Sequence, residues 1–500
     1  MREIIEFNIS CKADTMHEKS FVVSHAPNTL YLDVNMPEDA RYMGYLFLQD
    51  AQGKVRLQKL LGYGMHKIAI GEDGMHTTIG GVPGKICTGK WKIALGIFTE
   101  YVHQRLGEKE VAIEIIVTDE SMEITETIGI NNWTSEKNAD ISLDSYDWNY
   151  FYQTQKKWYK GDFHTHTTLS DGKETIRNAM KKAEDMELDF YVPTEHNLMH
   201  TGWCDSNCCI LPGIEITTEA GHFNLFGITK MPRNLLDIIK SNGSAQMEIY
   251  VRRIMQEAAE MRWIVSINHP FLGIWNWKYA DTKLNSFQCV EIINDPTYQG
   301  AQKSNDRAIA FLDALWNDGH RIWGVGGSDA HNLIGERYEG AELPSVAGDP
   351  GTYVYCEGLS ARQLLEQLRK GRVCVTRFCK IMPKITVGEK EYLPGDEILQ
   401  KNETITLTYA AKIYDIEEEP EIFLVKNGQK EKVMAVKSAS GVYEISKEIV
   451  LETNHWNWVR LEVRSKNGVF LGFVNPVSCG RMTSLCSTVA EIWEKMGETT

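Results

Sequence analysis

The stretch KGDFHTHTTLSDG, residues 160–172, places His164 and His166 one residue apart and Asp171 five residues later, just before a glycine. Chance alone gives about 0.4 such His-x-His pairs in a chain of this histidine content, so the pair by itself is weak. It becomes informative because other apolar runs of the same region end in the same kinds of residue. The question it raises is what holds imidazoles and carboxylates together at the end of a strand.

Five motifs between residues 158 and 335 close an apolar run with a histidine or a carboxylate: FHTHTTLSDG, PTEHN, PGIEITTEAGHFN, INHP and GSDAH. The runs alternate with stretches of helical pattern at 174–186, 245–260, 306–318 and 360–370. Strand and helix in alternation predict a parallel sheet or barrel with helices outside. In such a barrel the strand ends converge on one face, so we expect these side chains to meet there.

The flanking regions have a different rhythm, with short alternating runs such as TLYLDVNM and HWNWVRLEV and a hairpin turn at Lys466-Asn467-Gly468. Period-two alternation with frequent turns indicates antiparallel β-sandwiches. We therefore predict a multidomain α/β plus β chain. Its parts are an N-terminal β-sandwich (1–150), a hydrolase barrel (151–385), a C-terminal β-sandwich (386–480) and a helical tail (481–500).

Two tryptophans of the C-terminal region, Trp456 and Trp458, fall on one face of a predicted strand. We expect them to pack against the middle region, and the alternative is a carbohydrate-binding or partner surface. The three neighbouring cysteines Cys204, Cys208 and Cys209 lack a second Cys or His pair at zinc-site spacing, so we expect ordinary reduced thiols.

Composition excludes several classes of protein. The chain of 500 residues has a net charge of −15 and no Lys/Arg-rich run, which predicts no binding to nucleic acid or anionic lipid. No segment approaches the roughly 20 apolar residues that span a bilayer, and the N-terminus lacks a signal-like apolar core. We therefore expect a cytoplasmic globular protein with no membrane partner, and its oligomeric state stays open.

Gathering imidazoles and carboxylates in one place costs on the order of several kcal/mol, through lost hydration and mutual repulsion, unless cations compensate. Neutral imidazole nitrogen and carboxylate oxygen are the ligands that zinc, manganese and iron prefer. The lack of cysteine in the set argues against a purely structural zinc. The sequence thus indicates a divalent-metal site in the middle region.

The ordered set H-x-H, S-D-G, E-H-N, P-G-x-E, G-H, N-H-P and S-D-A-H resembles the PHP (polymerase and histidinol phosphatase) superfamily. Its arrangement is most similar to the carbaryl-hydrolase-like branch of that superfamily, over about residues 158–380. The resemblance implies a distorted (βα)7 barrel of the PHP type. It also implies two or three divalent metal ions, Mn, Zn or Fe, as cofactors.

Carried over position by position, the resemblance implies three metal sites and a hydroxide that bridges the metals. The first would use His164, His166, Glu215 and Asp329, the second Glu215 with His222 and His269, and the third Asp171, His196 and His331. The implied catalytic centre consists of His164, His166, Glu215, Asp329 and His331. One departure is Glu195, where many family members have an aspartate before the histidine, and it questions the orientation of His196.

The charge of such a site suggests its substrate. Three ligand carboxylates and three divalent ions leave roughly +3, which suits a phosphate group. We therefore predict a metal-dependent phosphoesterase acting on a small phosphate-bearing molecule. The same hydroxide can attack a carbonyl, so hydrolysis of a carbamate, carboxylic ester or amide is the alternative, and a binding or scaffold protein is the third.

Six further residues are expected to contact the substrate: Arg177, Trp275, Trp277, Glu291, Asn294 and Arg377. The two arginines could reach a phosphate oxygen, and the alternative for each is a solvated surface charge. The two tryptophans could wall the pocket or pack beneath their loop. Glu291 and Asn294 end another strand and could contact the substrate or support a metal ligand. A cationic side chain close to the metals would favour phosphate as the substrate group. An apolar pocket rich in tryptophan would favour the ester.

Overall fold

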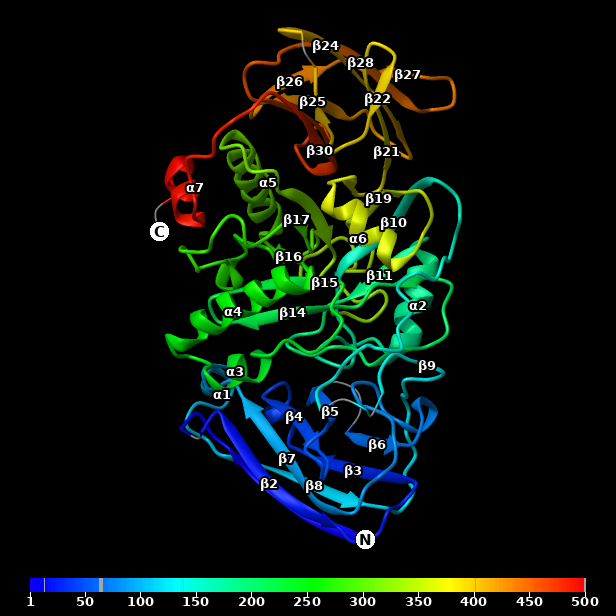
Figure 1. The fold of residues 1–500 in the computed structure, drawn as a ribbon, viewed down its shortest axis with the longest axis vertical. Helices are drawn as coiled ribbons and strands as arrows, with labels where there is room; N and C mark the ends of the chain where they lie inside the picture. The colour runs from blue at the N-terminus through cyan, green and yellow to red at the C-terminus, as the bar shows by residue number, and fades with distance from the viewer. Residues whose placement is uncertain (13, 63–65, 136, 138, 401, 499–500) are drawn as a thin grey trace.

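The computed structural model describes residues 1–498 apart from 13, 63–65, 136, 138 and 401. It is a mixed α/β structure with many strands and, in the described part of the chain, seven α-helices. Three tiers follow one another along the chain in Figure 1, with the N-terminal strands at one end and the C-terminal strands at the other. The metal-ligand motifs all belong to the middle tier.

The N-terminal tier consists of two antiparallel four-stranded sheets, in the strand orders β1-β8-β3-β6 and β2-β7-β4-β5. Alternate residues of both sheets share one apolar core, which includes Phe7, Phe21 and Trp91. This is the sandwich that the period-two pattern predicts. The strands are β1 Arg2–Ile9, β2 Met16–Val23, β3 Thr29–Asn35, β4 Gly44–Gln49, β5 Val55–Leu60, β6 Lys67–Gly71, β7 Gly89–Ile97 and β8 Val111–Thr118, with α1 Thr99–Leu106, η1 Glu38–Ala40 and η2 Gly74–His76.

The middle tier contains the strands and helices that the apolar runs and helical stretches predict. Its strands are β9 Asn131–Asn132, β10 Lys157–Thr165, β11 Phe190–Pro193, β12 Gly202–Trp203, β13 Cys209–Ile210, β14 Gly213–Thr218, β15 Gly221–Phe226, β16 Ile264–Ile267, β17 Cys289–Asn294, β18 Trp323–Gly327, β19 Gly351–Cys356 and β20 Val373–Thr376. Its helices are α2 Ile176–Asp185, α3 Leu235–Lys240, α4 Gln246–Met261, η3 Gly273–Trp275, α5 Ala301–Asn317 and α6 Ala361–Arg369.

The predicted closed (βα)7 barrel is not found as one continuous sheet in the described residues. Strands β14 to β18 form one sheet, and β10 and β11 belong to another. The two sheets pack against each other, but in the described chain the β-bridges between them are the isolated pairs Thr165–Ala330 and His196–Glu215. Strict βα alternation also fails, because β14 and β15 form a hairpin and β15 runs antiparallel to β16. The turn that joins β14 and β15 around Gly221 is too short to contain a helix.

The C-terminal tier is a second β-rich unit whose strands continue a sheet of the middle tier. Strand β20 pairs with β30, so one sheet runs from β13 through β10 to β26. A five-stranded sheet packs on it around a core that includes Leu407 and Leu461. The elements are β21 Lys380–Val387, β22 Lys390–Tyr392, β23 Glu397–Ile398, β24 Thr404–Tyr414, β25 Glu421–Lys426, β26 Gln429–Val433, β27 Val436–Lys437, β28 Tyr443–Glu452, β29 Asn457–Arg464 and β30 Phe470–Cys479. The last helix, α7 Val489–Met496, returns to the middle tier and lies beside α5 (Figure 1).

The two tryptophans of the C-terminal tier pack against α5 of the middle tier. Nε1 of Trp456 donates to the carbonyl oxygen of Trp316, 2.7 Å away, and Nε1 of Trp458 donates to Asn317 Oδ1, 3.0 Å away. Because both indoles are used in this contact, they bind the tiers together. None of the helices in the described ranges has the length and hydrophobicity needed to cross a bilayer.

Candidate metal centre

The nine predicted metal ligands meet in one cluster at the ends of the middle-tier strands. His164 lies in β10 and His166 directly after it, His196 follows β11, Glu215 is in β14 and His222 in β15. Asp171 comes from the turn after β10. His269 follows β16, and Asp329 and His331 follow β18. Although the sheet is not continuously closed, the strand ends still bring distant sequence positions to one point.

Glu215 is the centre of the cluster, with no exposed surface. Its Oε1 lies 3.3 Å from His164 Nε2, 3.2 Å from His222 Nδ1 and 3.5 Å from His269 Nε2. Its Oε2 lies 2.6 Å from His196 Nδ1. With His166 Nε2, 3.8 Å from Oε2, one carboxylate thus faces five imidazoles through its two oxygens, which is the arrangement that a bridging ligand requires.

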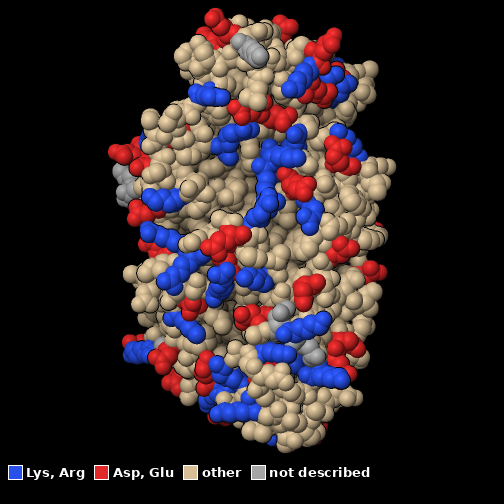
Figure 2. Space-filling view, viewed as in Figure 1, with Lys and Arg blue, Asp and Glu red and all other residues tan. Residues whose placement is uncertain are grey.

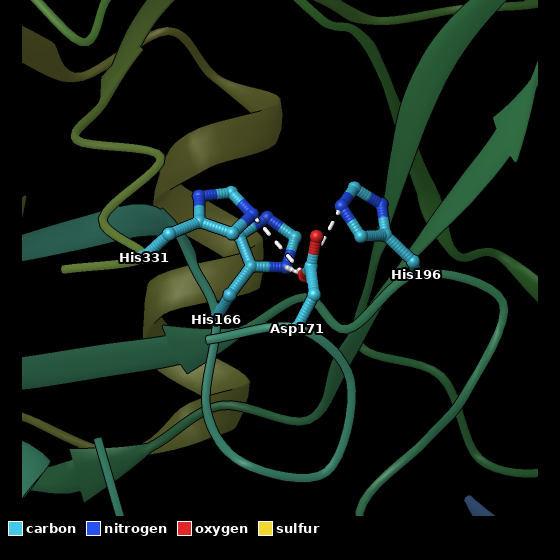
Figure 3. Close-up of side chains that lie close together, drawn as sticks. All are labelled: His166, Asp171, His196 and His331. Carbon is cyan, nitrogen blue, oxygen red and sulfur yellow. Dashed lines mark ion pairs between the residues drawn. The ribbon is translucent and has the colours of Figure 1, made fainter. Parts of the chain in front are cut away.

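Asp171 gathers a second group of imidazoles. Its Oδ1 lies 3.4 Å from His196 Nε2, 3.3 Å from His331 Nε2 and 4.0 Å from His166 Nδ1. Figure 3 shows the three rings around the Asp171 carboxylate, with the residues coming from three separate segments of the chain. These four side chains form one set of possible ligands for a single ion.

Asp329 links the two groups. Its Oδ1 lies 3.0 Å from His166 Nε2, 3.3 Å from His164 Nε2 and 3.6 Å from His331 Nδ1. The residue has a φ of +51°, which costs free energy for a non-glycine residue. Its amide donates to the carbonyl oxygen of His164, 2.8 Å away, and this bond holds the strained turn.

The donor atoms fit divalent ions. Two ligands bound to one ion at about 2.1 Å lie roughly 3.0–3.4 Å apart, which matches most of the contacts above. The buried atoms His164 Nε2, both ring nitrogens of His166, His222 Nδ1 and Asp329 Oδ1 have no hydrogen-bond partner among the described residues. Buried polar atoms are normally paired, so these point to a missing partner. The three candidate groups are His166/Asp171/His196/His331, His164/His166/Glu215 and His196/Glu215/His222, and none contains a cysteine.

The electrostatics keep part of this donor set ready to bind a cation. Burial and the neighbouring His331 and His196 lower the pKa of His166 to about 4, so its ring is neutral at pH 7. Burial alone would raise the pKa of Asp171, but His196 and His331 outweigh it and hold that pKa well below the usual range. Burial would lower the pKa of His196, but Asp171 and Glu215 outweigh it and raise that pKa well above the usual range. A metal ion therefore competes with protons here and releases them on binding.

Two of the predicted substrate contacts instead support the ligands. Glu291 Oε1 lies 2.9 Å from His164 Nδ1, and its Oε2 accepts from the His269 amide, also 2.9 Å away. Asn294 lines the pocket and donates to Asp329 Oδ2, 3.2 Å away, and to Glu291. Such partners fix the tautomer and orientation of a ligand. Glu291 is therefore placed to orient His164.

Glu195, the departure from the family pattern, is fully buried and bonds to residues between two of the predicted metal ligands. It accepts hydrogen bonds from the backbone and hydroxyl groups of Thr167 and Ser170, and its Oε1 lies 2.8 Å from His200 Nε2. These donors, with His200, hold its pKa at about 2 against the effect of burial. The glutamate therefore holds the turn that joins His166 to Asp171, and His196 is still in the cluster.

The N-terminal tier also reaches this turn, which the sequence did not predict. Nζ of Lys59, in the all-buried strand β5, donates to the carbonyl oxygen of Thr168, 2.5 Å away. Glu126 accepts from Thr168 Oγ1 and from the Ile176 amide. Gln58 donates to the carbonyl oxygen of Met199, 2.6 Å away. No sequence motif identifies these residues, because a lysine in a strand of alternating pattern is expected to lie at the surface.

A pocket of about 310 Å³ opens onto the cluster. Trp275 lines it with 37% of its surface exposed, and its ring stands edge-on to Tyr298, 5.9 Å away. Trp277 is buried to 1% exposure and donates to Thr282 instead, so the prediction that it walls the pocket is wrong. Within the described chain no Lys or Arg lines the pocket.

Neither predicted arginine lies in the pocket. Arg177 is exposed on α2 and lines a separate groove. Arg377 is buried and forms a bidentate ion pair with Asp349, at 2.7 and 2.8 Å. An arginine after a strand can as well neutralise a buried carboxylate as bind a substrate, and the sequence does not distinguish the two.

Five pocket residues escaped the sequence analysis: Leu272, Asp295, Tyr298, Asn332 and Tyr338. Tyr338 donates to Asp295 Oδ2, 2.6 Å away, and its ring packs edge-on against Tyr298 at 5.2 Å. Burial raises the pKa of Asp295 to about 6. The only signal was the run IINDP, in which the aspartate follows Asn294 directly.

Comparisons with known proteins give weak likenesses. No protein-family model matches this chain, and the curated proteins include no match. Similar solved structures include a protein described as a metal-dependent phosphoesterase from Bifidobacterium adolescentis (12% identity, 38% of this chain and 92% of that chain, TM-score 0.27). Another is an amidohydrolase from Chromobacterium violaceum with bound sulfate and no metal (17% identity, 36% of this chain and 90% of that chain, TM-score 0.22). A third is a β-glucuronidase from Ruminococcus gnavus (10% identity, 62% of this chain and 73% of that chain, TM-score 0.23). We therefore base the function of the site on its own donor atoms.

Proposed function

We propose that this chain is a metal-dependent hydrolase of the PHP type, and that its substrate is a small phosphate ester. The observation that carries the proposal is the sharing of Glu215 and Asp329 among imidazoles that belong to all three candidate metal groups. Every motif that resembles the PHP superfamily contributes its side chain to this cluster. A non-catalytic scaffold would not need six histidines with unpaired or shared donor atoms in one buried place.

Two or three divalent ions held by the nine ligands would lower the pKa of water and neutralise charge on the leaving oxygen. The chain itself supplies the positioning. Glu291 holds His164, Glu195 holds the turn between His166 and Asp171, and Asn294 holds Asp329. Because these partners are buried and hydrogen-bonded, the ligands are fixed before the substrate arrives.

A specific observation favours a second candidate, hydrolysis of a carboxylic ester, carbamate or amide. The pocket is walled by Trp275, Tyr298 and Tyr338, and none of its described lining residues is a lysine or an arginine. A phosphate would have to be neutralised by the metal ions alone. A neutral ester needs no such charge, and aromatic walls bind apolar groups well.

The test is turnover of paired chromogenic substrates by the purified protein loaded with manganese or zinc. A phosphate monoester and a diester are compared with a carboxylic ester and a carbamate. Phosphate release that is lost in His166→Ala supports the phosphoesterase. Cleavage of only the ester or carbamate, lost in the same variant, establishes the second candidate. No turnover of any substrate by a metal-loaded protein would contradict both.

A further inference from the structure

A basic groove lies on the side of the middle tier opposite the metal centre. It has a volume of about 480 Å³ and is lined by Arg321, Trp323, Arg369, Lys370 and Arg372, together with residues 395–397 of the C-terminal tier. Trp323 begins β18 and Arg372 precedes β20, whereas Asp329 follows the other end of β18. The groove is therefore separate from the catalytic pocket.

The groove has more positive than negative charge. Arg321 pairs with Glu397 at 3.3 Å and Arg372 with Asp396 at 3.0 Å. In contrast, Arg369, Lys370 and the neighbouring Arg262 have no carboxylate within 4.0 Å among the described side chains. The four cations and two carboxylates that line the groove leave an excess of about +2 on a chain with a net charge of −15. Figure 2 shows Lys and Arg side chains gathered over this face, where α5 and α6 approach the C-terminal strands.

Arg369 lies close to a second arginine. Its guanidinium donates to the backbone carbonyl oxygen of Arg262. Burial and the charge of Arg262 lower the pKa of Arg369. Nη1 of Arg372 is buried and has no acceptor in the described chain. A buried donor without an acceptor is destabilising, and an anion in the groove would supply the missing acceptor.

We propose that this groove binds a small molecule through its phosphate groups, as a second site that takes no part in the hydrolysis. Guanidinium groups match phosphate oxygens in bidentate geometry, and Lys370 adds a point charge at the rim. The volume suits a small ligand. A nucleic acid would need a longer positive tract, which an acidic chain of this kind does not offer. The bound anion would contact the cationic side chains of the middle tier, while Asp396 and Glu397 stay paired with Arg372 and Arg321.

The test is calorimetric titration of the full-length protein with pyrophosphate at constant ionic strength. Pyrophosphate also binds metal ions, so the titration is repeated after treatment with a chelator. Binding in the groove persists without metal, whereas binding at the catalytic cluster disappears. If all binding is lost on chelation, the proposal is wrong.

The variant R369Q/K370Q removes two unpaired cations at exposed or half-buried positions, which leaves the fold intact. We expect at least a tenfold loss of affinity for metal-free pyrophosphate binding and unchanged hydrolysis of the chromogenic substrate. The matched control K109Q/R481Q removes two exposed charges elsewhere and keeps the wild-type affinity. Should the double variant unfold, the single change K370Q, at an exposed side chain, still weakens binding.

Two comparisons define the ligand. ADP and pyrophosphate share the diphosphate group. Equal affinity for the two would show that the groove recognises the phosphates, and tighter binding of ADP would show a further contact to its organic part. Both results support the site. Equal affinity for sulfate at the same ionic strength would show only general ionic attraction and would overturn the proposal. An oligonucleotide that binds far more tightly than either would overturn it as well.

Discussion

Lys59 of the N-terminal sandwich donates from Nζ to the carbonyl oxygen of Thr168, in the turn that joins His166 to Asp171. The lysine is 1% exposed, and its charge faces Glu126 and Glu195. A strand of one tier therefore supports the ligand turn of another. The N-terminal sandwich thus has a structural role in the metal centre.

The Lys59→Met variant tests this support through the pH dependence of stability. Burial lowers the pKa of Lys59 to about 8, although Glu126 and Glu195 oppose the effect. Between about pH 8 and the usual value near 10.4, the folded chain binds fewer protons at Lys59 than the unfolded chain. The free energy of unfolding of the wild type should therefore rise with pH, relative to Lys59→Met, by about 1 kcal/mol per pH unit in this window. Urea unfolding at pH 7.5, 8.5 and 9.5 measures the two slopes, and parallel slopes would show that the Lys59 pKa is normal.

Replacing Glu195 by glutamine should weaken metal binding without touching a ligand. A glutamine cannot accept every hydrogen bond that Thr167, Ser170 and His200 direct at the carboxylate, so the turn loosens. Changes of this kind cost about 10–100-fold in metal affinity. Competition with a chromogenic chelator measures it. The exposed Glu184→Gln on α2 is the control, and equal affinity in both variants would exclude the role of Glu195.

Arg377 should matter for stability and not for substrate binding. Removing it in Arg377→Met leaves the buried Asp349 unpaired, which should lower the free energy of unfolding by about 3–5 kcal/mol. The double change Arg377→Met/Asp349→Asn should recover part of that loss. Denaturant unfolding gives the stabilities and steady-state kinetics give KM. A raised KM in Arg377→Met with normal stability would return this arginine to the substrate site.

Replacing each of the two tryptophans after β16 should change a different property, substrate binding for one and stability for the other. Trp275→Ala removes an exposed pocket wall and should raise KM severalfold with little change in Tm. Trp277→Ala empties a buried position and should cost about 3–5 kcal/mol in the free energy of unfolding. Each variant serves as the control for the other. If Trp277→Ala raised KM at unchanged Tm, the pocket would extend beneath the loop.

The convergence of the motif side chains could be predicted from the sequence because each motif sits at a strand end, and strand ends are fixed by local pattern. Their assignment as metal ligands rests on the resemblance and stays a prediction. The sequence predicted the sandwiches for the same reason of local pattern. It did not predict that β15 would run antiparallel, since a tight turn at Gly221 decides this and the apolar run is the same in either direction. The partners of Arg377, Trp277 and Lys59 depend on contacts between distant segments, and a single sequence shows no trace of these.

We expect the cluster around Glu215 to hold divalent metal ions, and the number of metal ions bound per chain tests this directly. Protein loaded with manganese or zinc, freed of excess metal by gel filtration, is analysed by mass spectrometry for metal per chain. We expect two or three ions per chain in the wild type. Both His166→Ala and Asp171→Asn should lose at least one ion, with circular dichroism showing that the fold is retained. Fewer than one ion per wild-type chain, or equal content in the variants, would contradict it.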